Sequence, residues 1–181
     1  MIQDLKRFSL PKDFRGRQGW YVQFWWIVQS LLFNPSPQFM YGWRRFLLRS
    51  FGADIGRGVI IRPTVRTQFP WKVRIGEYSW IGDDAVLYSL GPITIGENVV
   101  ISQKCYLCTG SHDYTNSDFP IFFEPIHIEN ECWLATDVFV GPGVRIGEGT
   151  IVGARSSVFK SLPANKICNG SPVRIIRDRI S

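Results

Sequence analysis

A repeat of six residues is the feature that most constrains the fold of this chain. Between residues 55 and 163, aliphatic side chains recur in blocks at every sixth position, and a small residue usually stands four positions after each of them. Helices have a period of 3.6 residues and simple strands a period of two, so neither produces this pattern. The repeat positions are Ile55, Ile61, Ile75, Ile81, Leu87, Ile95, Ile101, Leu107, Ile128, Leu134, Val140, Ile146, Val152 and Val158.

A triangular solenoid explains a period of six. Three hexads form one coil, the aliphatic side chains point inward, and successive coils stack as parallel strands about 4.8 Å apart. Glycine often takes the second place of a hexad, where a turn needs either a positive φ or a close approach of backbone. These glycines are Gly56, Gly76, Gly82, Gly96 and Gly147. We therefore expect an all-β solenoid of about five coils over residues 55–163.

The spacing between coils supports this prediction and reveals an insertion. A coil without insertions advances by about 18 residues. The step from Ile128 to Ile146 is 18 residues, whereas the step from Ile95 to Ile128 is 33. One coil therefore carries about 15 extra residues, which we expect as an extruded loop over residues 108–127. Long loops in compact domains are usually functional or disordered.

Residues 1–54 differ in composition from the repeat. The whole chain has a net charge of +6, and residues 1–50 hold eight basic and two acidic side chains, while residues 51–181 hold thirteen of each. The same 50 residues contain 12 of the 26 aromatic residues. A basic, aromatic segment is compatible with nucleic acid, a membrane surface or a partner chain.

The N-terminal segment is expected to form helices over residues 17–34 and 38–50, separated by the prolines of residues 34–37. These helices would cap the first coil. Arg44, Arg45 and Arg49 alternate with apolar side chains, so we also expect peripheral membrane contact through residues 17–50. Residues 164–181 are expected to form a short C-terminal tail.

Targeting signals are not evident in the sequence. No apolar run of signal-peptide type follows Met1, and the apolar stretch of residues 20–33, which is interrupted by Gln23, Gln29 and Ser30, is too short to span a bilayer. Four cysteines without a signal peptide favour reduced thiols. We therefore expect a cytoplasmic protein, with any membrane contact at the inner face.

Several motifs resemble one protein family. The repeat, together with residues 101–103, 107–114 and 170–174, resembles the left-handed β-helix of hexapeptide-repeat acyltransferases, in the branch named for colanic acid biosynthesis acetyltransferases. Residues 69–71 and the aromatic N-terminal region are also similar to that branch. The resemblance implies a homotrimer with active sites between subunits, and an acetyl-CoA-dependent O-acetyltransferase that acts on a sugar hydroxyl in exopolysaccharide biosynthesis.

His112 is the candidate catalytic base. Acetyl transfer from a thioester to a hydroxyl needs a base for the hydroxyl proton, and imidazole suits this task near neutral pH. A solvated loop histidine is the alternative, but the resemblance places a catalytic histidine at this point of the loop. Asp113 is a candidate for orienting the ring, and an Asx-turn is its other possible role. His127, where the chain re-enters the repeat, is interpreted as a packing residue.

The resemblance also implies where acetyl-CoA binds, in a cleft between coils of two subunits. The matching positions are Trp133, Thr136 and Ala154 along the pantetheine arm and Lys160, Arg174 and Arg177 at the phosphates. For each basic residue, an ordinary solenoid surface charge is the alternative. Tyr88 falls where related sugar acetyltransferases bind the acceptor. Arg155 and Phe159 depart from the family pattern, which commonly has Gly and Thr there.

No metal is expected. The chain has only two histidines, which argues against the three-histidine zinc site of the carbonic anhydrases that share this fold. Cys105 and Cys108 form a CxxC motif, which alone could indicate metal or redox chemistry. The repeat places Cys105 and Cys132 at small inward positions, so we interpret them as buried packing residues.

Two alternatives to the sugar O-acetyltransferase stay open. One is an acetyltransferase with another acceptor, such as an amino sugar or an antibiotic-like molecule. The other is a non-catalytic β-helix scaffold, because repeat surfaces often only bind. A histidine within an extruded loop favours the enzyme, and no nucleic-acid partner is expected.

Overall fold

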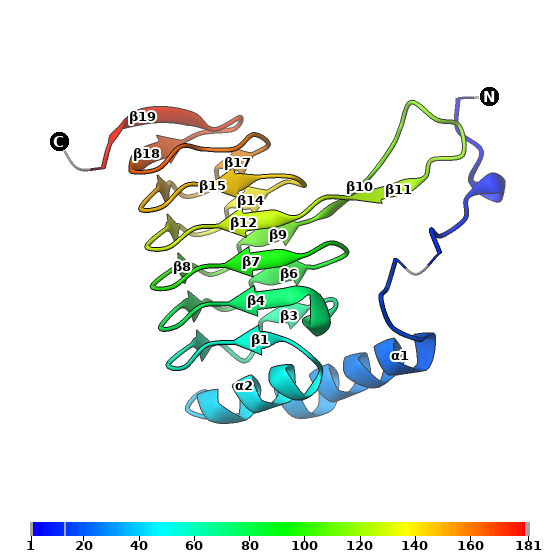
Figure 1. Ribbon diagram of the computed structural model, residues 1–181, viewed down its shortest axis with the longest axis horizontal. Helices are drawn as coiled ribbons and strands as arrows, with labels where there is room; N and C mark the ends of the chain where they lie inside the picture. The colour runs from blue at the N-terminus through cyan, green and yellow to red at the C-terminus, as the bar shows by residue number, and fades with distance from the viewer. Residues whose placement is uncertain (1, 13, 180–181) are drawn as a thin grey trace.

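The protein is a parallel β-solenoid with helices at one end. The computed structural model describes residues 2–12 and 14–179; residues 1 and 13 of the expected N-terminal segment and residues 180 and 181 of the expected tail lie outside the described residues. The solenoid is the left-handed β-helix that the sequence predicts, with about six turns. Helices α1 (Gly19–Val28) and α2 (Tyr41–Ser50) lie beneath its first turn (Figure 1).

Three parallel sheets form the faces of the solenoid. Sheet A contains β1 (Asp54–Ile55), β4 (Val73–Ile75), β7 (Ile93–Ile95), β12 (Ile126–Ile128) and β15 (Arg145–Ile146). Sheet B contains β2 (Ile60–Ile61), β5 (Trp80–Ile81), β8 (Val100–Ile101), β13 (Trp133–Leu134), β16 (Ile151–Val152), β18 (Lys166–Asn169) and β19 (Arg174–Asp178). Sheet C contains β3 (Arg66–Thr67), β6 (Val86–Tyr88), β9 (Tyr106–Cys108), β14 (Phe139–Val140) and β17 (Ser157–Val158). The chain passes from A to B to C in each turn, so we refer to the BC corner and the CA corner.

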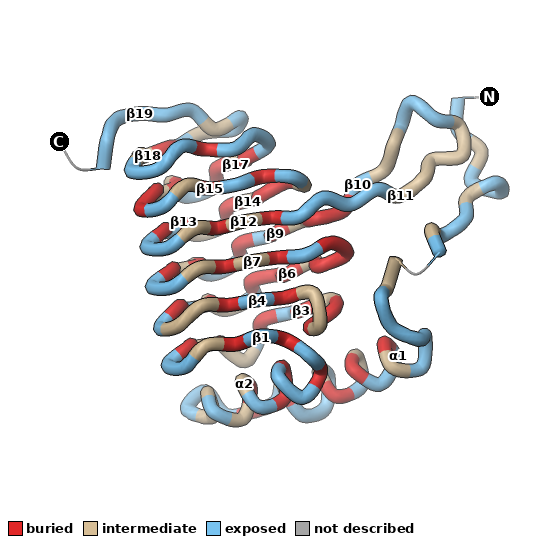
Figure 2. Tube along the Cα trace, viewed as in Figure 1, coloured by how far each residue is buried: buried red, intermediate tan, exposed pale blue. Residues whose placement is uncertain are grey.

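Strand pairing confirms the register expected from the repeat. Ile55 pairs with Ile75 and Ile75 with Ile95, and the pairing then passes over the insertion from Ile95 to Ile128 before reaching Ile146. All fourteen repeat side chains are buried. Buried repeat residues alternate along the strands with residues that are intermediate or exposed (Figure 2).

Close backbone approach explains the glycines at the second place of the hexads. A Cβ on Gly82 would lie 2.6 Å from the backbone nitrogen of Gln103, and a Cβ on Gly147 would lie 2.4 Å from that of Ala164. The positive φ values come two positions after such glycines, as at Gly58 and Asn98. Of the two expected reasons for glycine, the close approach between turns is therefore the one that applies.

The solenoid continues past residue 163, where the sequence suggests only a tail. Leu162 bridges to Ile146 in sheet A, and β18 runs parallel to β16 in sheet B. The chain then reverses, and β19 pairs with β18 in the antiparallel direction. Cys168 is fully buried at the inward place that aliphatic residues fill in earlier turns. The hexad pattern misses this sixth turn because a cysteine replaces the aliphatic residue.

The extruded segment is an ordered hairpin in its first and last parts. Strand β10 (Gly110–His112) pairs with β11 (Ile121–Phe123) in the antiparallel direction, which sets His112 opposite Ile121. The hairpin leaves the solenoid at the CA corner and projects to its side (Figure 1). Within the expected loop 108–127, only its tip and short connections are irregular.

The N-terminal helices cap the first turn, as expected. The helix expected over residues 17–34 is α1 followed by a π-helical turn, η2 (Gln29–Phe33), and the helix expected over 38–50 begins at Tyr41. Two short 3-10 turns, η1 (Leu5–Arg7) and η3 (Pro70–Lys72), complete the helical elements. In the described part of the chain, no helix is long and apolar enough to cross a membrane.

Backbone groups that the first turn leaves without a neighbouring turn explain why this cap is rich in Arg and Trp. Several carbonyls of the first turn face the cap, among them those of Ile55 and Ile61, and the N–H of Thr67 also faces the cap and donates to the side-chain oxygen of Gln29 at 2.8 Å. Buried carbonyls need donors. The side-chain donors in the cap and their acceptors are Trp25 to Thr67, Trp26 to Gln68, Asn34 to Pro63, Arg44 to Ile61, Arg45 to Val59 and Arg49 to Ile55.

These contacts correct the role expected for three arginines. Arg44 is fully buried, and Arg45 and Arg49 also donate to carbonyls of the first turn, at 2.7 and 2.9 Å. The guanidinium groups expected to bind anionic lipid therefore hold the cap on the solenoid instead. The sequence pattern indicates a solvated polar face for the arginines of α2, but an arginine side chain can also be a buried hydrogen-bond donor.

Candidate active site

His112 lies on the hairpin with one ring nitrogen fixed. Its Nδ1 is 2.9 Å from the backbone carbonyl oxygen of Phe119. A carbonyl can only accept a hydrogen bond, so Nδ1 carries the proton and donates it. In the neutral imidazole this leaves an unprotonated Nε2 that can accept a proton from a substrate. The geometry therefore provides the tautomer that a general base needs.

Phe119 also holds the ring of His112 by stacking. The two ring centroids are 4.3 Å apart and the planes differ by 13°. Phe119 adopts a φ of 49°, in the left-handed region that non-glycine residues seldom occupy. Such strain persists only where surrounding contacts enforce it, and it is common at functional sites. Sequence analysis did not identify Phe119, because neither its φ nor its contact with His112 follows from a repeat.

Asp113 does not contact the imidazole in this arrangement. Its Oδ1 accepts hydrogen bonds from the backbone N–H of Thr115 at 2.9 Å and from the Thr115 hydroxyl at 2.5 Å. These bonds lower the pKa of the Asp113 carboxyl. Of its two expected roles, the Asx-turn is the one seen, and the Phe119 carbonyl takes the place expected for Asp113 at the ring.

The first residues of the chain hold the tip of the hairpin, a contact that sequence analysis missed. The backbone N–H of Asp4 donates to the carbonyl of Ser117 at 2.8 Å, and Arg7 pairs with Asp118 at 3.1 Å. The Phe8 ring lies 6.0 Å from the His112 ring. The N-terminal segment therefore runs beside the candidate base as well as beneath the solenoid (Figure 1).

Three of the expected acetyl-CoA residues gather on sheet B and at the BC corner. Trp133 is 45% exposed on β13, and its indole N–H donates to the Ser102 hydroxyl at 3.0 Å. Thr136 lies at the BC corner of the same turn, where its hydroxyl donates to the carbonyl of Gln103. Ala154 is exposed at the same corner one turn later. These positions form one continuous strip along the solenoid.

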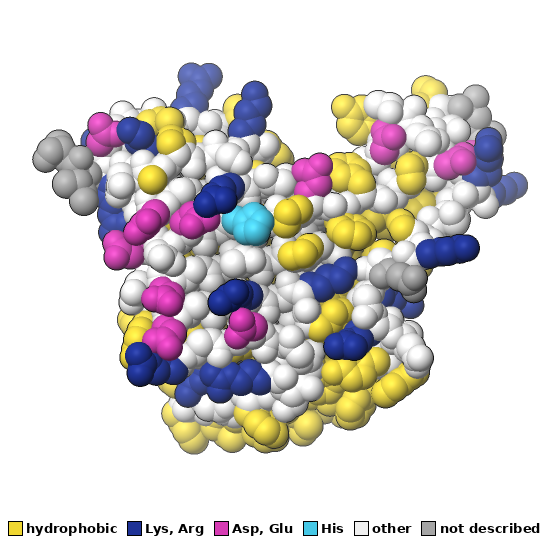
Figure 3. All heavy atoms as spheres, viewed as in Figure 1, with side chains coloured by type: hydrophobic (Ala, Val, Ile, Leu, Met, Phe, Trp, Pro, Cys, Tyr) yellow, Lys and Arg dark blue, Asp and Glu magenta, His cyan; other side chains and the backbone are white. Residues whose placement is uncertain are grey.

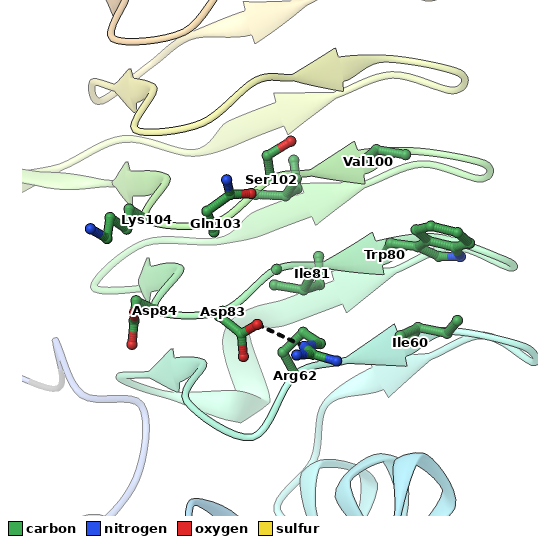
Figure 4. A pocket seen from close by; sticks show the side chains of 12 residues that line it. Ile60, Arg62, Trp80, Ile81, Asp83, Asp84, Val100, Ser102, Gln103 and Lys104 are labelled. Carbon is green, nitrogen blue, oxygen red and sulfur yellow. Dashed lines mark hydrogen bonds and ion pairs between the residues drawn. The ribbon is translucent and has the colours of Figure 1, made fainter. Parts of the chain in front are cut away.

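A cavity continues this strip toward the cap. It has a volume of about 340 Å³ and is lined by β2, β5 and β8 and the turns that follow them. Arg62 and Asp83 form an ion pair of 2.8 Å at one side, and Trp80, Ser102 and Gln103 line the rest (Figure 4). Sequence analysis did not identify this cavity.

One signal in the sequence could have located the cavity. Trp80 and Trp133 both precede a repeat residue, and both pair with Val100, so they occupy equivalent outward positions on sheet B. Large aromatic residues at an outward position of a solenoid are expected to mark a binding surface.

The structure places Tyr88 and Lys160 at the other corner. Tyr88 ends β6, and its carbonyl accepts from the Thr109 hydroxyl at 2.8 Å, three residues before His112. It lines a cavity of about 410 Å³ together with Trp26, Arg66 and Tyr106, and burial raises its pKa. Lys160 follows β17 at the CA corner and is exposed.

Arg174 and Arg177 lie on β19, at the far end of sheet B, and both are exposed. One chain therefore separates the expected site residues into two groups. His112, Asp113, Tyr88 and Lys160 are at the CA corner or on the hairpin that leaves it, whereas the remaining residues follow sheet B and the BC corner. In Figure 1 the hairpin points away from the stack of turns, so it does not fold back over sheet B of its own chain.

The cysteines agree with their interpretation as packing residues. Cys105 and Cys132 are buried, and burial raises the pKa of each thiol to about 11. Cys108, the second cysteine of the CxxC motif, is half-buried, and burial raises the pKa of its thiol. Over residues 2–12 and 14–179, no group of three or more His, Cys, Asp or Glu side chains is arranged to hold a metal ion.

Comparison with known proteins decides the family. No family model matches the chain. A protein of Escherichia coli K12 named for colanic acid biosynthesis, the acetyltransferase WcaF, is 60% identical over 179 residues, which cover 99% of this chain and 98% of the relative. This chain belongs to the hexapeptide-repeat acetyltransferases. Within that family it stands with the colanic acid biosynthesis branch.

More distant acetyltransferases share its fold. The galactoside O-acetyltransferase of Escherichia coli K12 is 28% identical over 81% of this chain and 73% of its own length. The hexapeptide-repeat acetyltransferase VCA0836 of Vibrio cholerae has a TM-score of 0.83, with 26% identity over 98% of both chains. A galactoside acetyltransferase solved with coenzyme A has a TM-score of 0.83 over 94% of this chain and 84% of that chain.

Proposed function

We propose that this hexapeptide-repeat acetyltransferase moves the acetyl group of acetyl-CoA to a hydroxyl of a sugar. The tautomer of His112 carries the proposal, because a ring nitrogen left free by the Phe119 carbonyl is what a general base requires. The name of the 60% identical relative supports an exopolysaccharide as the context. Two structures of related acetyltransferases, described as complexes with acetyl-CoA and with coenzyme A, support the donor.

The proposed reaction is a direct transfer. The acceptor hydroxyl oxygen attacks the thioester carbonyl carbon while Nε2 of His112 takes the hydroxyl proton. The bond from that carbon to sulfur then breaks, and the departing sulfur takes the proton from the imidazolium. The products are the acetyl ester and free coenzyme A. Asp113 takes no part in this scheme, because its carboxylate is bound to Thr115.

The proposed site lies between subunits of a homotrimer. The CA corner of one chain would supply His112 and Lys160, and sheet B of a neighbour would supply Trp133, Thr136 and Ala154. Arg174 and Arg177 on the same neighbour would bind the phosphates, where arginine forms paired hydrogen bonds. The separation of these groups on one chain supports a shared site.

The proposal also includes a binding site for the acceptor sugar. Tyr88, at the base of the hairpin, is proposed to contact the acceptor sugar, because its cavity offers aromatic rings together with the polar side chains of Gln29, Arg66 and Gln68. Such a mixture suits a sugar, which presents both apolar faces and hydroxyls.

We place the reaction in the cytoplasm, where acetyl-CoA is available.

The test is acetyl transfer by a His112→Asn variant. The purified protein is incubated with acetyl-CoA and a panel of sugars, and release of the coenzyme A thiol is followed. Loss of a general base lowers the rate by about 10² to 10⁴-fold. We expect this loss in kcat with the protein folded and its oligomeric state unchanged.

His127→Asn is the matched control, because it removes the other histidine of the chain. His127 lies on β12 within sheet A, paired with Thr94 and Arg145. We expect it to keep the wild-type kcat within about twofold. Full activity of His112→Asn would contradict the base role, and absence of thiol release from the wild type with every sugar would contradict the proposed acceptor class.

A further inference from the structure

The outer face of the cap carries a row of exposed apolar side chains. Trp20, Phe24, Ile27 and Leu31 follow one another along α1 and η2 at intervals of four, three and four residues, so they lie on one side of the helix. Trp20, Ile27 and Leu31 are 65%, 55% and 68% exposed. We call these four residues the outer row.

The opposite side of the same helix is already used. Val22, Trp25 and Val28 are buried against the first turn, and Phe33 follows them in η2. A helix that is apolar on all sides is normally covered on all sides. The outer row therefore presents an apolar surface that the described part of the chain does not cover.

The position of the outer row leaves the candidate active site free. The cap lies at the end of the solenoid, below β1, whereas the hairpin and sheet B are on its sides (Figure 1). Figure 3 shows the hydrophobic side chains gathered along this end of the molecule. A flat partner could bind the end without contacting His112 or Trp133.

The charge around the outer row favours an anionic lipid surface over a second copy of the chain as its binding partner. Residues 14–53 contain five arginines and no Asp or Glu. Three of these arginines donate to backbone carbonyls, which carry no net charge, so the cap keeps its positive charge. Two such ends would repel each other, whereas an anionic leaflet would attract them.

We propose that the outer row inserts into the interface of an anionic lipid membrane and holds the enzyme on the membrane with the solenoid standing away from it. Trp and Phe side chains favour the boundary between headgroups and acyl chains, and aliphatic side chains add apolar contact below it. The cap arginines contribute through their long-range charge and stay bound to the first turn. This differs from direct lipid binding by Arg44, Arg45 and Arg49.

The test compares vesicle binding of the wild type with that of an Ile27→Gln/Leu31→Gln variant. Both side chains are exposed, and glutamine is a good helix former, so the cap stays folded. Co-sedimentation is measured with vesicles of phosphatidylcholine containing a minority of phosphatidylglycerol, at low and at physiological salt. We expect at least a tenfold weaker partition coefficient for the variant, and weaker wild-type binding at higher salt.

The matched control is Ile175→Gln/Ile176→Gln, which removes two exposed isoleucines, 50% and 61% exposed, from β19 at the opposite end of the solenoid. It should bind vesicles like the wild type. Wild type that stays in the supernatant, or that binds pure phosphatidylcholine equally well, would overturn the proposal. A change of mass in light scattering for the Ile27/Leu31 variant would show an interface between copies instead. Vesicle binding is measured without acetyl transfer, so its outcome is independent of the proposed reaction.

Discussion

Phe119 gives His112 two constraints that act on different parts of the imidazole. The carbonyl fixes which nitrogen carries the proton, and the stacked ring limits rotation of the imidazole about its bond to Cβ. A base that rotates freely spends less time aimed at its substrate, so orientation contributes to the rate. At the scale of single residues, catalysis in this protein is expected to depend on a side chain that need not touch the reacting atoms.

Substitutions of Phe119 distinguish the effect of its side-chain ring on His112 from the effect of its backbone carbonyl. Phe119→Gly keeps the carbonyl and tolerates the left-handed φ, but it removes the stacked ring. We expect kcat to fall about tenfold with an unchanged KM for acetyl-CoA, because positioning and not donor binding is lost. Steady-state kinetics of thiol release would measure both constants.

Phe119→Tyr is the conservative control, and it should restore kcat because its ring can stack in the same way. A Phe119→Gly variant with wild-type kcat would show that the ring does not position His112. A rise in KM without a fall in kcat would assign Phe119 to substrate binding instead.

The residues that sequence reasoning located are those whose position follows from periodicity or from a local turn. The fourteen repeat side chains, the buried Cys105 and the Asx-turn at Asp113 are of this kind. Phe119 could not be located in this way, because its role depends on a fold of the hairpin tip that brings residues seven positions apart together. Contacts of that kind have no periodic signature in one sequence.

At the scale of elements, the cap is explained by the backbone groups that the first turn leaves without a neighbouring turn. Cap side chains donate to first-turn carbonyls, including those of Ile55, Val59 and Ile61, and Gln29 accepts from the N–H of Thr67. Arg and Trp side chains are donors without acceptor atoms, which makes them suited to this end. The sequence showed the excess of Arg and Trp, but their inward direction depends on which backbone groups of the first turn lie beside each side chain, and composition does not contain that information.

Arg44 is the clearest test of this explanation. It is fully buried and donates to the carbonyls of Ile61, Pro37 and Gln38 and to the hydroxyl of Ser36. Arg44→Met keeps most of the aliphatic volume but leaves these acceptors without their donor. We expect the free energy of unfolding to fall by about 3 kcal/mol or more, measured by denaturant titration.

Arg17→Met is the matched control, since Arg17 is exposed at the start of the same cap. A change within about 0.5 kcal/mol is expected for such a surface position. An Arg44→Met protein as stable as the wild type would show that the carbonyls of the first turn do not depend on this donor. The helices would then cap the solenoid through apolar packing alone.

At the scale of the whole molecule, the separation of the proposed site residues between two corners is the property that a single sequence describes least well. The repeat predicted that three hexads form one coil and that the coils stack as parallel strands, but it assigned no candidate site residue to a sheet. It did not show that His112 and Lys160 lie at the CA corner while Thr136 and Ala154 lie at the BC corner. That distinction depends on where the inserted hairpin leaves the turn.

A site shared between chains predicts complementation between two variants that are each impaired in a different half of the site, measured at an acetyl-CoA concentration below the KM of the phosphate-site variant. His112→Ala removes the proposed base of one chain, and Arg174→Ala weakens the proposed phosphate site on its neighbour. If the variants are unfolded together and refolded in equal amounts, mixed trimers contain some interfaces in which both residues are intact. With random mixing in a cyclic trimer, about a quarter of the interfaces combine an intact His112 from one chain with an intact Arg174 from its neighbour. We therefore expect about a quarter of the wild-type activity.

The control is to refold each variant alone and combine the two afterwards, so that no subunits exchange, which should give only the summed activity of the separate proteins. If the co-refolded mixture gives no more than that sum, while light scattering shows that mixed oligomers have formed, His112 and Arg174 act within the same chain. The hairpin would then have to fold back over its own sheet B, which lies on the other side of the solenoid from the CA corner. Recovery above the sum has no explanation within one chain, because no single chain in the mixture carries both intact residues.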